Sequence, residues 1–453
     1  MGSLFAALVG STNSLRAYDQ ALSVVQNNVA NASTPGYARQ VPTLVADRFE
    51  PNSGLAGGVS ATDPVSRRSE FLDEAVRNRQ SAVSYAQQRV SDLSQIEPVF
   101  SPEANAGIPG ALSRLFQSIT QVSVSPNNTA DRQVVIDRAN DVAKMFRDTA
   151  DSLGNAQADV DRQIGNTVDS INRLLGQIRD YNVGRSSSND TATDSGVNAN
   201  LHSTLEQLSE LVDFKAIQNP DNSLTILLGG SEPAVIGEHV FPISSQTSNG
   251  AATVSSAQGK DLTATLSSGQ LGALLEQRNK SLPGYTADLD TLAASFAGQV
   301  NQALSEGLDQ NGSTPSLDLF AFGDPSHPAS TMTTTAGFQT TDLALATSSG
   351  GGNGNCVNLA NLQSQPCIAG VTPAEYFGNI GANVGRDLND ATQSQETQSS
   401  LLSQALSLRD QHQGVSLDEE AATLMTFQRG YEACAKVVKA LDELTQTTLD
   451  LLP

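Results

Sequence analysis

The sequence predicts a mainly α-helical protein with β-rich inserts, in which long helices form an antiparallel rod and the N- and C-terminal helices pair as a coiled coil. Proline breaks helix interiors, and the 18 prolines of this 453-residue chain leave long stretches without one. Apolar residues recur in these stretches at spacings of three and four, which is typical of helices that pack along one face. The proline-free stretches are residues 1–34, 65–97, 127–219, 284–314 and 374–452.

The first of these stretches predicts an N-terminal helix that needs partners. Residues 1–38 contain two charged side chains, Arg16 and Asp19, whereas a helix that stays alone in water normally carries a charged face. We therefore expect this helix to be covered on several sides and to become well ordered only on assembly. Its predicted apolar face, the N-terminal stripe, consists of Leu4, Leu8, Leu15, Tyr18, Leu22, Val25 and Val29.

The last stretch predicts a C-terminal helix with a matching apolar face. Ser416 followed by Glu419 forms a capping box, and Asp418 and Glu420 add negative charge to the first turn, where the helix dipole favours it. Because each terminal helix offers one apolar face, we expect the two to pair. The predicted C-terminal stripe consists of Leu417, Leu424, Phe427, Tyr431, Val438 and Leu441.

The middle of the chain predicts helices interrupted by two inserts. Short β-prone runs between Gly, Asn and Pro turns predict a small β insert, and a segment rich in Thr, Ser, Gly and Pro predicts a loop-rich outer insert. Pro98 is expected to end one helix and Pro283 to kink another. The helices expected in this part cover residues 72–93, 135–178, 201–212, 271–304 and 382–408.

These patterns divide the chain into four parts. The terminal coiled-coil assembly domain and the helical rod domain are each assembled from separate segments. The parts are 1–60 with 410–453 (assembly domain), 61–213 with 270–311 and 374–409 (rod domain), 214–269 (β insert) and 312–373 (outer insert).

Composition excludes several function classes. A net charge of −22 gives no basic surface for wrapping nucleic acid, so no nucleic-acid partner is expected. No run of 18 apolar residues occurs, so no membrane insertion is expected. The four histidines, His202, His239, His327 and His412, lie far apart and form no metal-ligand or catalytic pairing. We expect no catalytic residue, no metal site and no cofactor.

The three cysteines leave one question open. Cys356 and Cys367 enclose a loop that contains Asn and Pro, where a disulfide forms if the protein meets an oxidising medium and free thiols persist otherwise. Cys434 lies on the apolar face of the last helix, where a small core side chain is the simplest interpretation.

The segment that follows the first helix carries a recognisable motif. Residues 27–37 read Asn-Asn-Val-Ala-Asn-Ala-Ser-Thr-Pro-Gly-Tyr, and this run resembles the NNxANxxTPGY signature of bacterial flagellar rod, hook and hook-associated proteins. The next residues, together with 415–422 and 269–278, resemble the hook-associated proteins of the hook-filament junction. Pro35 and Gly36 redirect the chain after the helix. The axial motif residues are Asn28, Asn31, Thr34, Pro35, Gly36, Tyr37, Arg39 and Gln40.

The resemblance implies a structural, non-enzymatic subunit of the extracellular flagellum that joins hook to filament. It implies assembly through the terminal helices after type III export. The implied partners are further copies of the chain, the flagellar hook protein, the other hook-filament junction protein and a cytoplasmic export chaperone that contacts the C-terminal stripe. Arg39 could pair across a subunit boundary or stay solvated. The alternative functions are a flagellin-like filament subunit and a secreted adhesin on a helical stalk.

Overall fold

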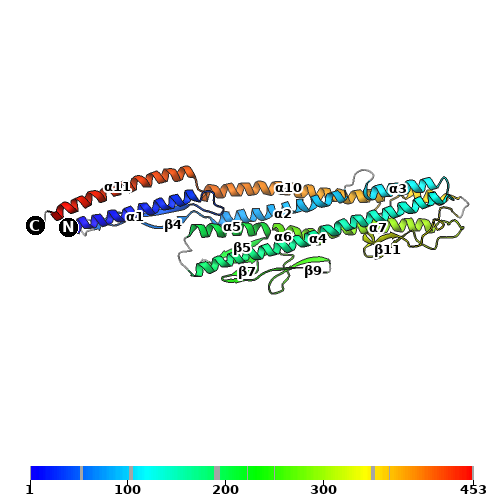
Figure 1. Cartoon of the computed structure of the whole chain (residues 1–453), viewed down its shortest axis with the longest axis horizontal. Helices are drawn as coiled ribbons and strands as arrows, with labels where there is room; N and C mark the ends of the chain where they lie inside the picture. Colours follow the sequence, from blue (N-terminus) through cyan, green and yellow to red (C-terminus); the bar gives the residue numbers. More distant parts are fainter. Residues whose placement is uncertain are drawn as a thin grey trace. The chain divides into compact units, whose positions relative to one another are not determined.

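The computed structural model describes residues 2–50, 55–100, 106–187, 194–221, 223–248, 250–347, 352–366 and 368–450. The chain is mainly helical with small antiparallel sheets (Figure 1), which confirms the predicted fold class. Its contacts divide it into two compact units. Unit 1 consists of Met1–Val83, Ser170–Ile243 and Gln398–Pro453, and unit 2 of Ser84–Asp169 and Ser244–Thr397. The four-part division drawn from the sequence stays a prediction.

Three long helices contribute residues to both units. They are α2 (Glu70–Phe100), α4 (Thr129–Ser187) and α10 (Pro373–Gln413). Each covers an expected helix and extends beyond it. Pro98 does not end α2, as the sequence predicts, but lies inside its last turn. A proline there removes one backbone hydrogen bond close to the helix end, which the packed helix tolerates.

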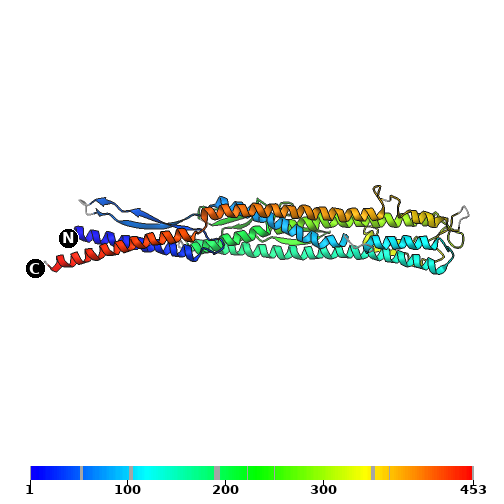
Figure 2. The same ribbon diagram turned by 90° about the horizontal axis from the view of Figure 1, so that it is seen from above.

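The terminal helices of unit 1 pack against each other. Helices α1 (Gly2–Ala30) and α11 (Leu417–Asp450) lie side by side and antiparallel in both views, with the chain ends together (Figures 1 and 2). The rings of Tyr18 and Phe427 lie 6.3 Å apart between centroids. Gly430 also faces Tyr18, and a Cβ there would come within 2.7 Å of the ring. The predicted pairing of the two termini is confirmed.

A β-hairpin covers a second side of α1. Strands β1 (Gln40–Ala46) and β4 (Val59–Ser66) pair antiparallel, with a register shift between Val41 and Thr43. The short strands β2 (Phe49–Glu50) and β3 (Leu55–Ala56) extend the ladder. Pro42 lies at the register shift, where its missing N–H costs the ladder least. The hairpin runs alongside α1 in Figure 2.

The rest of unit 1 joins α5 (Ser195–Leu211) to an antiparallel sheet. Asp194 caps α5 by accepting hydrogen bonds from two backbone N–H groups. The side chain of Asn182, on α4, donates to the carbonyls of Leu224 and Gly237 at 2.9 and 2.7 Å and thereby holds the sheet against the helix. The sheet has the order β5 (Phe214–Gln218), β6 (Leu224–Leu228), β7 (Glu232–Ile236) and β8 (His239–Val240).

Unit 2 has an aromatic core between its helices. Phe296 lies in the middle, with ring centroids 5.6 to 6.4 Å from those of Phe116, Phe146 and Phe320. Phe320 belongs to the segment expected to be a loop-rich outer insert, so this segment supplies side chains to the core of unit 2. The buried guanidinium of Arg132, on α4, also holds this segment in place. It donates to the carbonyls of Pro126, Thr340 and Leu343.

The helix expected over 271–304 is interrupted before its proline. Helix α6 (Gly269–Glu276) passes into a π-helical turn (Gln277–Ser281) and then into α7 (Leu282–Ser305), with Pro283 in the first turn of α7. The wider π turn accommodates the residues that precede the proline.

The remaining elements of unit 2 are α3 (Gly107–Val122), β9 (Ser244–Ser248), β10 (Ala251–Ser255), β11 (Phe320–Phe322), α8 (Pro328–Thr331), β12 (Met332–Thr334) and α9 (Gly354–Asn361). Among the described helices, none combines the length and apolarity needed to cross a membrane.

Candidate assembly site at the chain termini

The N-terminal stripe lies partly under α11. Val25 is buried and Val29 is 44% exposed at the end of α1, where α11 has just begun. The remaining members are half-buried, which is the burial expected where one helix covers another along a single line. The half-buried members are Leu4, Leu8, Leu15, Tyr18 and Leu22.

The most buried face of α1 was predicted as apolar only at Val25. It consists of Ser14, Ala17, Ala21, Val25 and Asn28, and it lies where the hairpin and α11 both approach the helix. Ser14 accepts a hydrogen bond from the backbone N–H of Val59 at 2.9 Å, which ties the hairpin to α1. Small side chains permit this close approach, but a search for large apolar residues passes over them.

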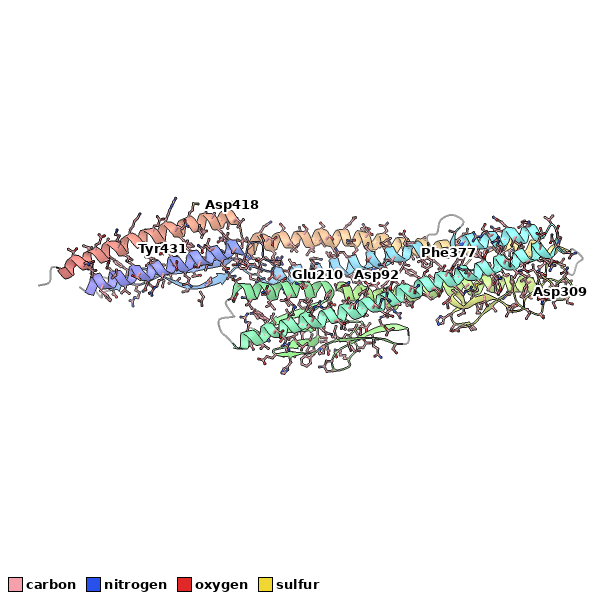
Figure 3. The ribbon with its side chains drawn as sticks, in the orientation of Figure 1. Asp92, Glu210, Asp309, Phe377, Asp418 and Tyr431 are labelled. Atoms are coloured by element: carbon pink, nitrogen blue, oxygen red, sulfur yellow. The ribbon has the colours of Figure 1, made fainter. Side chains whose placement is uncertain are left out.

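The C-terminal stripe covers α1 along most of α11. Leu424, Phe427, Tyr431, Val438 and Leu441 are half-buried, whereas Leu417 is 57% exposed. Figure 3 labels Tyr431 and Asp418 on α11. Away from the stripe, α11 also exposes Met425 and Leu444. Val437 is half exposed but lines a groove with Ala7 and Gly10 of α1. The terminal pair therefore leaves apolar surface of α11 uncovered.

Asn28 is the centre of a buried polar network that joins the two terminal helices. It is 1% exposed. Its Nδ2 donates to the carbonyl of Gln40 at 2.8 Å and to Oε2 of Glu420 at 3.1 Å. Its Oδ1 accepts from the Tyr37 hydroxyl at 2.8 Å and from the Gln40 N–H at 2.9 Å. Both donors and both acceptor positions of the amide are used, so the network is fully satisfied.

Arg39 pairs within the chain, so its side chain is not simply solvated, and a contact across a subunit boundary stays a prediction. Its Nε lies 2.7 Å from Oε1 of Glu420, and its Nη1 lies 2.8 Å from Oε2 of Glu419. The carboxylate of Glu420 is 1% exposed, and burial makes its cation partner necessary. The backbone N–H of Arg39 donates to the carbonyl of Gln413 at the end of α10.

The predicted capping box of α11 is half formed. Ser416 Oγ accepts from the backbone N–H of Glu419 at 3.4 Å. The Glu419 carboxylate does not return to the cap but binds Arg39. A charged partner attracts a carboxylate more strongly than a backbone N–H does, so the ion pair takes the place of the second half of the box.

The turn after α1 requires the residues of its motif. Asn31 Nδ2 donates to the carbonyl of Asn27, and Asn31 Oδ1 accepts from Thr34 Oγ1 at 3.1 Å. Pro35 is exposed at the tip. Gly36 has φ +72°, and a Cβ there would lie 2.3 Å from the carbonyl oxygen of Ala199. Only glycine fits this position.

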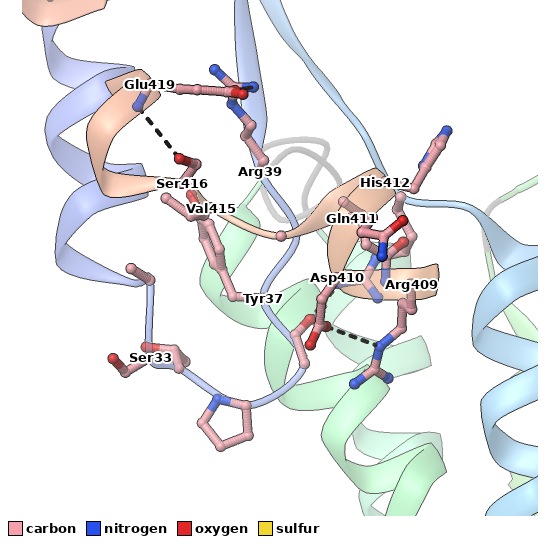
Figure 4. A pocket seen from close by; sticks show the side chains of 17 residues that line it. Ser33, Tyr37, Arg39, Arg409, Asp410, Gln411, His412, Val415, Ser416 and Glu419 are labelled. Carbon is pink, nitrogen blue, oxygen red and sulfur yellow. Dashed lines mark hydrogen bonds and ion pairs between the residues drawn. The ribbon is translucent and has the colours of Figure 1, made fainter. Parts of the chain in front are cut away.

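A polar groove of about 510 Å³ lies between this turn and the connection from α10 to α11 (Figure 4). Its walls are residues 32–37 and 409–416, with Arg39, Arg68 and Glu419. Arg68 donates to the carbonyl of Gly36 and pairs with Asp73 at 2.8 Å. The axial motif and the start of α11, which are at opposite ends of the sequence, therefore form one continuous surface in unit 1.

One cluster beside this surface has the composition of a metal site. Glu70, Asp73 and His202 bring their ligand atoms within 4.8 Å of one another. Both oxygens of Asp73 already accept hydrogen bonds at 2.8 Å, from Arg68 and from Gln413. The cluster therefore works as a structural ion network. The sequence gives no local signal for it, because its members lie on α2 and α5 and their neighbour Gln413 lies at the end of α10.

The pKa values of this cluster follow from its charges. Burial raises the pKa of Asp73, but the charge of Arg68 and the hydrogen bonds from Arg68 and Gln413 outweigh burial, so the pKa lies below its usual value. Burial, with Arg68 next, lowers the pKa of His202 to about 3, so the imidazole is neutral in the folded protein.

The disulfide question stays open. Cys356 is a buried free cysteine on α9, and burial raises the pKa of its thiol to about 11. Cys367 lies outside the described residues. A pairing of Cys356 with Cys367 remains a prediction. Cys434 is a free, half-buried cysteine on the α11 face that meets α1.

Comparison with known proteins identifies the family. Residues 93–320, about half of the chain, match the model of the flagellar hook-associated protein FlgK helical domain. Residues 411–451 match the model of the flagellar basal body rod FlgEFG protein C-terminal region.

Individual proteins agree with these matches. The chain is 26% identical to flagellar hook-associated protein 1 of Bacillus subtilis over 501 positions, covering 99% of each protein. It is 24% identical to flagellar hook-associated protein 1 of Salmonella typhimurium over 330 positions, covering 69% of this chain and 58% of that protein.

A solved structure shares the fold. The flagellar hook junction protein FlgK from Burkholderia pseudomallei superposes with a TM-score of 0.67 at 15% identity, over 76% of this chain and 100% of that one. These findings confirm the expected hook-filament junction protein over the alternatives of a filament subunit and an adhesin. The chain belongs to the flagellar hook-associated protein FlgK family, whose members are structural, non-enzymatic proteins of the extracellular flagellum at the hook-filament junction.

Proposed function

We propose that the chain takes its place in the junction by packing its α1–α11 pair against the same pair of further copies. The observation that carries this proposal is the uncovered outer face of α11. Met425 and Leu444 are each about half exposed there. Burying such side chains contributes ~1.5–3 kcal/mol each. On α1, Phe5 and Val9 are exposed as well, so each copy offers two different apolar faces.

Two different faces on one subunit suit a ring or tube. A contact between unlike surfaces repeats from copy to copy, and it closes into a ring when the rotation permits. The Asn28 network supports this role, because it fixes the register of the two terminal helices before a neighbour binds. The axial motif residues then serve the assembly indirectly, as the scaffold that holds the pair in one arrangement.

The further partners follow from the family resemblance. They are the flagellar hook protein on one side, the other hook-filament junction protein on the other, and a cytoplasmic export chaperone before secretion. The chaperone would cover the C-terminal stripe, which α1 covers in the folded chain. Type III export of an unfolded chain suits this arrangement, because an apolar helix needs cover until its partner helix is available.

The experiment uses substitutions on the outer face of α11. Met425→Glu and Leu444→Glu place charge where a neighbouring copy would pack but not where α1 does. Gln446→Glu, an exposed polar position on the same helix, is the matched control. Electron microscopy of isolated hook ends should show addition of the wild type and of the Gln446 variant and no addition of the other two. Circular dichroism checks that all four monomers are folded.

Normal addition of both glutamate variants would contradict the proposed interface. The chaperone contact is tested separately, because Leu424→Glu should lower the amount of secreted protein through weaker chaperone binding. If Leu424→Glu is secreted as well as the wild type, the C-terminal stripe is not the chaperone contact.

A further inference from the structure

The carboxyl group of Asp92 is buried in unit 2 without a cation beside it. Asp92 lies on α2 (Figure 3) and is 4% exposed. Its Oδ1 accepts a hydrogen bond from Gln88 Nε2 at 2.7 Å. Its Oδ2 is buried and has no hydrogen-bond partner in the described part of the chain. Buried acids are normally paired with a cation or several donors, so this one needs an explanation.

The partners that Asp92 has belong to a layer of neutral amides. Gln88 Nε2 also donates to Gln163 Oε1 at 3.1 Å, and Gln88 Oε1 accepts from Gln270 Nε2 at 3.0 Å. The layer therefore joins α2, α4 and α6. Amides supply hydrogen bonds but no charge, and a single amide donor stabilises a buried carboxylate far less than an ion pair does.

The charged groups on the same stretch of α2 and α6 are engaged elsewhere. The Arg89 guanidinium lies over the Tyr85 ring, 5.9 Å from its centroid. Glu276 accepts a hydrogen bond from the Tyr85 hydroxyl and lies 3.8 Å from Lys280. None of these groups reaches Asp92 through a contact in the described structure.

The charged groups on the neighbouring stretches of α4, α7 and α10 also contact partners other than Asp92. On α4, Asp161 pairs with Arg278 of the π turn at 2.8 Å. Between α7 and α10, the Tyr285 hydroxyl donates to Asp387 at 2.8 Å. The charged groups around Asp92 thus contact partners other than Asp92.

The energetic consequence depends on pH. Burial raises the pKa of Asp92 from its ordinary 3.8 to about 7, and the Gln88 hydrogen bond lowers it only in part. Between these two pH values the unfolded chain carries the ionised carboxylate and the folded chain the protonated acid. Folding then takes up a proton, so stability falls as pH rises towards neutral. Above the folded pKa the full cost of the buried charge remains.

We propose that ionisation of the Asp92 carboxyl destabilises the helical core of unit 2. This unit is then more stable while the carboxyl is protonated and less stable at and above neutral pH. Its use rests on the proposed export of an unfolded chain, for which a unit of low stability in a neutral cytoplasm is an advantage. The titration itself is independent of export and of junction assembly.

The test measures unfolding of the full-length chain in urea between pH 5 and pH 9. Asp92→Asn keeps the shape of the side chain and its contact with Gln88 but cannot ionise. Asp151→Asn, at an exposed position of α4 in the same unit, is the matched control. Hydrogen exchange in peptides covering 84–100 and 269–282, corrected for intrinsic rates, reports unit 2 separately from unit 1.

Between about pH 5 and pH 7, the unfolding constant of the wild type should rise about tenfold per pH unit relative to that of Asp92→Asn, because one proton is linked. The control should follow the wild type. Parallel pH profiles for the wild type and Asp92→Asn would overturn the proposal. If Asp92→Asn does not fold, the proposal is tested instead by following the titration of the aspartate carboxyls of the wild type with carbon-13 NMR. Titration of every aspartate below pH 5 would also overturn it, and one carboxyl titrating near pH 7 would support it.

Discussion

Asn28 and Glu420, which are 392 positions apart in the sequence, share a buried hydrogen bond of 3.1 Å. The bond joins the last turn of α1 to the first turn of α11. Because Asn28 also binds Tyr37 and both backbone groups of Gln40, one amide sets the positions of α1, the turn, the first strand and α11. A buried amide of this kind fixes helix register in coiled coils.

Replacing Asn28 with Ala should therefore destabilise unit 1 more than an ordinary surface change. The variant takes one hydrogen-bond partner from the Tyr37 hydroxyl, from both backbone groups of Gln40 and from Oε2 of Glu420, and each buried group left unsatisfied costs ~1–3 kcal/mol. Urea unfolding should show a loss of at least about 2 kcal/mol. Asn13→Ala, at an exposed position of α1, should change stability by less than about 0.5 kcal/mol. Equal stability of the two variants would refute the register role.

The two carboxylates bound by Arg39 should differ in importance. Glu420 is 1% exposed and Glu419 is 64% exposed. Arg39→Gln leaves the buried carboxylate of Glu420 without its cation, which should cost about 2 kcal/mol or more. Glu419→Gln removes a solvated pair and should cost less than about 1 kcal/mol. Thermal unfolding measures both. A loss with Glu419→Gln as large as that with Arg39→Gln would show that the exposed pair carries the interaction.

The terminal helices could be predicted because their apolar spacing is local information. The same reasoning placed α4 and the capping residue Ser416. It missed α3, because Pro109 lies in its first turn and a search for proline-free stretches excludes it, although proline is well tolerated at a helix start. It also missed the small-residue face of α1, where the approach of a strand selects Ala17 and Ala21 for size and leaves no periodic apolar signal.

The sequence motif located the polar residues of the site, but it did not predict which residues they contact. The motif pointed to Asn28, Tyr37 and Arg39, yet their partner Glu420 has the ordinary appearance of an acidic residue in a first helical turn. His202 likewise looks isolated in the sequence, and only the fold brings Asp73 to 3.4 Å from its Nδ1. Pairings between distant segments depend on topology, which spacing along the chain does not encode.

Gly36 should tolerate no side chain. Gly36→Ala imposes a positive φ on a residue with a Cβ and drives that Cβ towards the Ala199 carbonyl, so unit 1 should lose more than about 2 kcal/mol. Gly176→Ala is the control, since Gly176 lies within α4 with open space around it, and alanine there should stabilise by about 0.5–1 kcal/mol. Urea midpoints compare the two. Stabilisation by both substitutions would mean that the turn relaxes without the Gly36 conformation.

Unit 1 should respond to pH in the direction opposite to unit 2. His202 is buried, and its folded pKa of about 3 lies below the ordinary 6.5, because burial and the guanidiniums of Arg68, Arg77 and Arg409 oppose a further positive charge while Asp73 favours it. As pH falls below the ordinary value, the unfolded chain takes up a proton that the folded chain refuses. Stability contributed by the neutral imidazole is therefore complete above about pH 7 and declines towards acid.

His202→Gln removes this titration. Between pH 7.5 and pH 5, the wild type should lose stability relative to the variant, with the unfolding constant rising towards tenfold per pH unit below the ordinary pKa. His412→Gln, at an exposed position in the same unit, should follow the wild type. Hydrogen exchange in peptides covering 195–211 reports the opening of α5, on which His202 lies. If the His202 and His412 variants show the same pH profile as the wild type, the buried imidazole is protonated in the folded chain and the ion network must be redrawn with a charged histidine.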